Sequence, residues 1–181
     1  MRPLLGVAGV LIASVFTMSL VSYAQDSKVS GNPGYFEFSA IEGSYGDPSV
    51  TINLNKSLLK LLGAFEHDDP EAAEAIKNLE LVRIQVYEEL DESGSYSDAD
   101  QQMLTMRASL DAASWDRVVE ARDEEERVDI YVKQDGEAIQ GIVVMALDEE
   151  DAVFINILGN IQPEQIAAIV DHVDIDLDLS F

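Results

Sequence analysis

Cysteine is absent from this chain of 181 residues, and histidine occurs only twice. The absence of cysteine excludes disulfides, thiolate metal sites, thiol nucleophiles and a lipid anchor attached at an exported N-terminal cysteine. The scarcity of histidine, the commonest catalytic base, leaves little material for general acid–base catalysis. The phosphate-binding motifs G-x-x-x-x-G-K-[ST] and G-x-G-x-x-G and the esterase motif G-x-S-x-G are also missing.

Positive charge is scarce as well. The chain has 11 lysines and arginines against 35 aspartates and glutamates, a formal net charge of −24. Such a field repels phosphate backbones and anionic head groups, which argues against nucleic-acid and membrane-surface binding. Two interpretations stay open. The acidity keeps the protein soluble in a saline exterior, or it attracts a partner that carries a basic patch, such as an envelope protein.

The N-terminus has the three parts of a secretory signal. Arg2 gives a positive start, Leu4 to Leu20 is apolar, and Ser22-Tyr23-Ala24 is a small-x-small exit. We therefore expect residues 1–24 to be a signal peptide cleaved after Ala24. The product would reach the periplasm or the extracellular space without stable membrane insertion. A retained anchor is the alternative, but small and hydroxyl residues dilute the apolar segment, and no basic residues follow it.

The mature sequence predicts one domain of α+β class. Residues 25–34 are expected to be a polar, flexible lead-in, 35–173 the domain, and 174–181 an acidic tail or edge strand. Alternation predicts strands near 50–54 and at 82–88, followed by a C-terminal meander over 117–158, so the sheet is mostly antiparallel. Within the meander, Asp135-Gly136 is a strong hairpin turn.

Three to four helices are expected to pack against this sheet. Asn55 caps a helix through Phe65, Pro70 opens the next as far as about Leu79, and Ser97 caps a third. Pro163 opens a fourth. Apolar side chains define an inward side on the first and third helices: Leu58, Leu59, Leu61, Leu62 and Phe65, then Met103, Met106, Leu110 and Ala113.

The two histidines are weak candidates for chemistry. His67 lies in the acidic stretch Glu66–Asp69, where it could join carboxylates around a metal ion, although a solvated loop between helices explains it better. His172 lies near the end of the predicted last helix, where the helix dipole favours a cation without any function.

Carboxylates are so numerous that no particular pair stands out for a glycosidase-type hydrolase, which stays an alternative. Weak divalent-cation binding by the loops Asp123–Glu126 and Asp148–Asp151 is another. The tail from Asp174 to Asp178 superficially resembles the start of a calcium loop, but it lacks the glycine and the closing glutamate that an EF-hand needs. Its alternation suits an edge strand or a frayed tail, with Ile175, Leu177 and Leu179 on one face.

Trp115 is interpreted as a core anchor, and Lys56 with Lys60 as one of the few basic spots on an acidic molecule. No residue is assigned a catalytic, cofactor-binding or metal-binding role.

Several segments together resemble a family of exported bacterial proteins, the domain-of-unknown-function 4252 family. They are Pro33-Gly34-Tyr35, Val50 to Leu54 with Ser57 to Leu61, Trp115 to Val119, Val128 to Lys133 and Phe154 to Ile161. These motifs are strand cores and turns that span nearly the whole mature chain, so the resemblance implies a fold and no site residue. The leading hypothesis is a non-enzymatic periplasmic or cell-envelope module that binds a protein or another envelope component.

Overall fold

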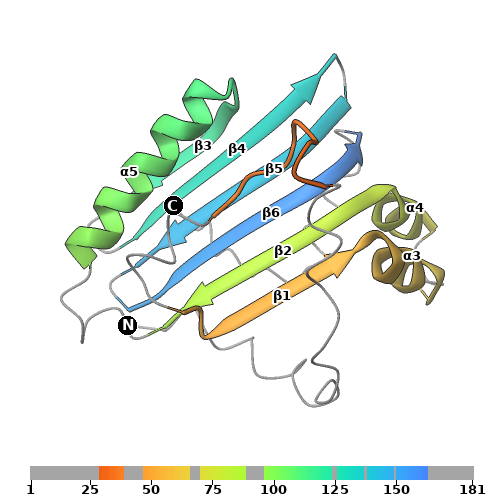
Figure 1. Ribbon diagram of the computed structural model, residues 1–181, viewed down its shortest axis with the longest axis horizontal. Coiled ribbons are helices and arrows are strands. Elements are labelled where there is room, and N and C mark those ends of the chain that lie inside the picture. Colours follow the sequence, from red (N-terminus) through yellow and green to blue (C-terminus); the bar gives the residue numbers. More distant parts are fainter. Residues whose placement is uncertain are drawn as a thin grey trace.

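The computed structural model describes residues 29–38, 47–65, 70–88, 96–123, 126–136, 138–148 and 150–162. The predicted signal peptide, the helix predicted from Pro163, the tail 174–181 and both histidines lie outside the described residues. Element labels follow Figure 1.

The centre of the molecule is one six-stranded antiparallel sheet, in the order β1-β2-β6-β5-β4-β3 (Figure 1). The predicted α+β class and the C-terminal meander, β3 through β6, are confirmed. The strands run as follows: β1 Val50–Asn55, β2 Leu79–Tyr87, β3 Asp116–Arg122, β4 Arg127–Asp135, β5 Ala138–Leu147 and β6 Ala152–Ile161. β2 starts earlier than predicted because Leu79, expected at the end of a helix, pairs with Gly159.

The described helices are α3 (Lys56–Phe65), α4 (Pro70–Asn78) and α5 (Tyr96–Ala112). The predicted cap of α3 is confirmed, since Asn55 Oδ1 accepts hydrogen bonds from the amides of Ser57 and Leu58 at 3.0 and 3.1 Å. Helix α5 begins at Tyr96, one residue before the predicted cap Ser97.

The end of α5 explains a second difference from the prediction. Trp115 N donates to Leu110 O, and Ser114 N donates to Asp111 O, each at 3.0 Å. With Ser114 at a φ of 58°, these bonds form the left-handed C-terminal turn that glycine usually makes. Ala113 therefore lies beyond the helix and is exposed instead of facing the core.

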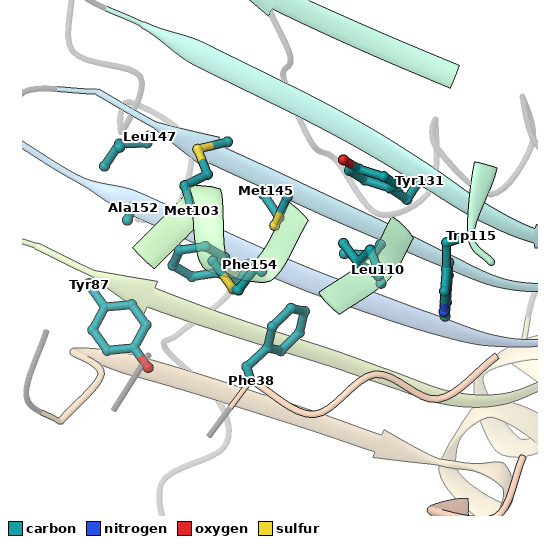
Figure 2. Close-up of a cluster of buried hydrophobic side chains, with 12 residues drawn as sticks. Phe38, Tyr87, Met103, Leu110, Trp115, Tyr131, Met145, Leu147, Ala152 and Phe154 are labelled. Atoms are coloured by element: carbon teal, nitrogen blue, oxygen red, sulfur yellow. The ribbon is translucent and has the colours of Figure 1, made fainter. Parts of the chain in front are cut away.

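Each face of the sheet carries its own core. On one face, α5 and the segment Asn32–Phe38, here called the N-terminal strap, cover an aromatic and methionine-rich cluster (Figure 2). Its members are Phe36, Phe38, Tyr87, Met103, Met106, Leu110, Trp115, Tyr131, Val143, Met145, Leu147, Ala152 and Phe154. On the other face, Leu59 of α3 and Ala75 of α4 pack against aliphatic side chains of the sheet.

The strap is fixed by a fully buried asparagine. Asn156 on β6 donates from Nδ2 to Gly34 O and Ile142 O, both at 3.1 Å, and its Oδ1 accepts from Phe36 N at 3.0 Å. The backbones of Gly34 and Gly141 touch here. A Cβ on Gly141 would lie 2.3 Å from Gly34 O, so neither position has room for a side chain. The strap, which begins inside the stretch predicted as a lead-in, is thus part of the packed domain.

Candidate binding surface at the β1 edge

Within the described residues, β1 and β3 form the two edges of the sheet. β1 reads Val-Thr-Ile-Asn-Leu-Asn, with no charged residue and no proline, and it pairs with β2 through six consecutive residues without a bulge. Ile52, at its middle, is 39% exposed. Natural proteins usually protect such an edge with charge, proline or a bulge, because its unpaired amides and carbonyls can accept another strand.

Helix α3, which follows β1 directly, presents most of its apolar side chains to solvent. Of the five expected to face inward, only Leu59 is buried. The other four are 44% (Leu58), 52% (Leu61), 47% (Leu62) and 70% (Phe65) exposed. Together with Ile52 and the edge of β1, these four side chains form what we call the β1–α3 surface.

Tight packing of α3 on α4 explains this exposure. A Cβ on Gly63 would lie 2.8 Å from Ala73 O, so the two helix backbones approach closely along a narrow contact that uses Leu59 and Gly63. That contact leaves the remaining leucines on the outer side. Exposed leucine and phenylalanine side chains that gather on one helix indicate an interaction site more often than scattered ones do.

The β1–α3 surface also differs in charge from the rest of the molecule. From Pro48 to Phe65 the chain contains no acidic residue and two lysines. Lys56 Nζ lies 3.2 Å from Glu80 Oε1 in an exposed ion pair, and Lys60 is exposed on the same helix. The predicted basic spot therefore belongs to an apolar surface, a combination that neither lysine alone could have indicated.

A polar cluster holds β1 and the strap to β2. Arg83 on β2 is buried; its Nε donates to Asn53 Oδ1 at 3.2 Å, and its Nη1 donates to Tyr35 OH at 3.0 Å and Glu37 Oε1 at 3.1 Å. The Tyr35 hydroxyl donates to Glu37 Oε2 at 2.5 Å. Burial, followed by the bond to Glu37, raises the pKa of Tyr35 to about 12, against the opposing effect of Arg83. All these groups form hydrogen bonds with one another, so we assign the cluster a structural role.

A second buried arginine joins α5 to β4. Arg107 Nε donates to Asp129 Oδ2 at 2.6 Å, and Asp129 is fully buried. Burial raises the pKa of Asp129, while the neighbouring Arg107 opposes that change. A carboxylate with no exposed surface cannot contact a substrate in this structure. The sequence carried a signal for the pair: Arg107 follows Met103 by four residues on the buried side of the helix, and Asp129 stands between Val128 and Ile130 in a strand.

In each acidic loop considered for cation binding, the first aspartate binds backbone amides. Asp148 Oδ1 accepts from the amides of Glu150 and Asp151 at 2.8 and 2.6 Å, and Asp123 Oδ1 accepts from Glu126 N at 2.7 Å. Among the described residues, no group of three or more histidine, aspartate or glutamate side chains could hold a metal ion.

Trp115 is buried in the aromatic cluster, with its ring centroid 6.4 Å from that of Phe36, so its interpretation as a core anchor is confirmed. In the described part of the chain, no helix is both long and apolar enough to cross a membrane.

In the part of the chain that the structure describes, these features define a protein class: an α+β domain with one antiparallel sheet, helices on both faces and one unprotected edge. Residues 45–169 match the family described as Domain of unknown function (DUF4252), which covers more than half of the chain. The chain belongs to this family, and the resemblance seen in its strand motifs is confirmed. No curated protein and no solved structure matches the chain.

Proposed function

We propose that the protein is exported and acts in the periplasm or cell envelope as a non-enzymatic module that binds a partner protein at the β1–α3 surface. The observation that carries this proposal is the unprotected β1 edge beside a helix with three exposed leucines and an exposed phenylalanine. An extended partner segment can add to such an edge as a further strand, gaining affinity from backbone hydrogen bonds and specificity from alternate side chains.

Charge supports a partner with two chemical features. The net charge of −24 favours encounter with a protein that carries a basic patch. The contact itself, on an apolar surface that contains no acid from Pro48 to Phe65, favours an extended apolar segment. We therefore infer an envelope protein in which an apolar strand lies next to basic residues.

The contacts of the ionisable groups with shifted pKa values support a non-enzymatic role. Asp129 is held by Arg107, and Tyr35 is held by Glu37 and Arg83. Groups with shifted pKa values mark catalytic sites when they face a cleft, but structural networks shift pKa values too. Both groups described here belong to such networks.

Site-specific photocrosslinking in the cells that make the protein tests the proposal. A photoreactive amino acid in place of Leu61 should yield an adduct with another protein, whereas the same residue in place of Val118 on β3 should not. Val118 is a matched control because it is 55% exposed on the opposite edge. Equal adducts at both positions, or none at Leu61, would contradict the proposed surface.

Export is tested separately in the same cells. The chain recovered from the periplasm or the medium should have the mass of a product that starts at Gln25. A full-length chain confined to the cytoplasm would contradict export while leaving the binding surface open to the crosslinking test.

A further inference from the structure

The C-terminal residues 174–181 have the chemistry that the β1–α3 surface lacks. They read Asp-Ile-Asp-Leu-Asp-Leu-Ser-Phe, so apolar side chains alternate with aspartates. Alternation at period two is the pattern of a strand with one apolar and one polar face. Such a segment can offer an edge both backbone hydrogen bonds and apolar contacts.

Charge favours one location for this segment. Asp174, Asp176 and Asp178 are repelled by an acidic surface, and most of this molecule is acidic. The stretch from Pro48 to Phe65 carries two lysines and no acid; Lys60 is exposed, and Lys56 is exposed in its ion pair with Glu80. On β3 both arginines already contact Glu120, Arg117 at 3.1 Å and Arg122 at 2.8 Å, and Asp116 adds a second acid, so this edge offers no net positive charge.

The sheet topology brings the tail within reach of β1. β1 and β6 each pair antiparallel with β2, so they run in the same direction and end at the same end of the sheet. A strand beyond β1 would lie three strand spacings from β6, about 14 Å. The residues from Gln162 to Val173 span about 18 Å even if they are entirely helical, so they can cover this distance.

We propose that residues 174–181 add to the β1 edge of the same chain as a further strand and compete there with the external partner. This inference rests on the proposed function for its regulatory meaning, because the tail would occupy the surface that the partner needs. Binding would then require the tail to leave, and a partner strand would have to pair better than a tethered competitor.

Disulfide trapping in the full-length chain tests where the tail lies, and the absence of native cysteine makes every thiol an introduced one. Ile52→Cys would be combined in turn with Ile175→Cys, Leu177→Cys and Leu179→Cys, since the pairing register is one of these three. At least one pair should form an intramolecular disulfide about tenfold faster than Leu177→Cys paired with Val118→Cys, because pairing holds the thiols at a high effective concentration.

The trapping experiment decides whether the tail lies at the β1 edge. Equal rates at the two edges, or no disulfide at Ile52 in a chain with native circular dichroism, would overturn the proposal. Disulfide-linked dimers in place of monomers would also overturn it and would assign the edge to the tail of a second copy. Ile52 and Val118 are both exposed, so these substitutions leave the core intact.

Charge reversal separates this inference from the proposed function. The variant Asp176→Lys with Asp178→Lys should raise the partner adduct at Leu61 about threefold to tenfold, the shift in occupancy that losing weak charge contacts allows. Asp116→Lys with Glu150→Lys makes the same charge change at exposed positions away from β1 and should leave the adduct unchanged. A trapped tail without any partner adduct would refute only the proposed function. A partner adduct that the tail variant leaves unchanged, together with no trapped disulfide, would refute only the inference about the tail.

Discussion

The two edges of the sheet differ in how far they are protected against pairing with another chain. β3 carries Asp116, Arg117, Glu120 and Arg122, and its register shifts between Arg117 and Val119. Charge and irregularity are two common ways to stop an edge from pairing with another chain. β1 has neither. A protein that protects one edge and leaves the other bare keeps the bare edge available for a strand, which is why we place the interaction there.

The two halves of the sheet also differ in how they are held. Near β3, the buried pair Arg107–Asp129 ties α5 to β4. Near β1, Arg83 ties β2 to β1 and to the strap, but its acidic partner Glu37 is 52% exposed. The β3 half therefore depends on one costly buried contact, whereas the β1 half depends on several weaker ones in contact with solvent.

The largest expected effect comes from Asp129→Ala. The change leaves the guanidinium of Arg107 buried without a counter-charge, so the free energy of unfolding should fall by about 3–5 kcal/mol. Urea denaturation followed by tryptophan fluorescence at Trp115 measures it. As the matched change in the β1 half, Arg83→Ala should cost about 1–2 kcal/mol, because solvent screens its ion pair and replaces part of its hydrogen bonding.

Replacing the whole pair provides a control for that comparison. Arg107→Leu with Asp129→Leu removes both charges at once and should destabilise less than Asp129→Ala alone. If Arg83→Ala lowered the free energy of unfolding as much as Asp129→Ala does, the two halves would be equally stabilised. That result would contradict the comparison.

A charge placed on each edge should affect binding at only one of them. Ile52→Lys adds to β1 the protection that β3 already has, and it should lower the partner adduct at Leu61 about tenfold, equivalent to roughly 1.4 kcal/mol. Val118→Lys puts the same side chain on β3 and should leave the adduct unchanged. If Val118→Lys also abolished the adduct, the partner would contact both edges and the distinction between them would fail.

Removing the charges of β3 should change solubility more than stability. Its ion pairs are between about a third and a half exposed, so Arg117→Ser, Glu120→Ser and Arg122→Ser together should cost about 1 kcal/mol or less, and less still at high salt. The bare edge should instead promote self-association, detectable by sedimentation at increasing concentration. A variant that stays monomeric throughout would mean that the charges of β3 are not what protects it.

The smallest expected effect is confined to alkaline pH. The folded pKa of Tyr35 is raised from 10.0 to about 12, so its protonated form contributes stability below pH 10, and that contribution is lost as the pH rises through 12. The difference in unfolding free energy between the native chain and Tyr35→Phe should shrink over this interval. Absorbance titration of the phenolates provides a second measurement: Tyr35→Phe should remove a late-titrating tyrosine. A constant difference between pH 9 and 12 would contradict the assigned cluster.

Features that depend on near neighbours in the sequence could be predicted. Asn55 caps α3 because its side chain reaches amides two and three residues on, and Gly136 turns the β4–β5 hairpin with a φ of 65°. The order of the meander follows from short turns between consecutive strands.

Features that depend on distant contacts could not be predicted. The leucines of α3 form an apolar stripe, but the close contact between Gly63 and the backbone of Ala73 decides which of them are buried. Asn156 gives no sign in the sequence that it anchors the strap, because its partner Gly34 is more than a hundred residues away. The β1–α3 surface was missed for the same reason, since exposure is a property of the assembled fold.

The pairing of β2 with β6 has a consequence for how the protein is made. Tyr87 lies opposite Ala152, and Leu79 lies opposite Gly159, so these two neighbouring strands are separated in the sequence by most of the domain. The four meander strands can assemble from local contacts, but β1 and β2 have no place to join until β6 exists. During synthesis the N-terminal strands emerge first and complete the sheet last. The region that carries the bare edge is thus the last to fold, and a newly made chain is expected to need protection from aggregation at β1 and β2 until β6 has emerged.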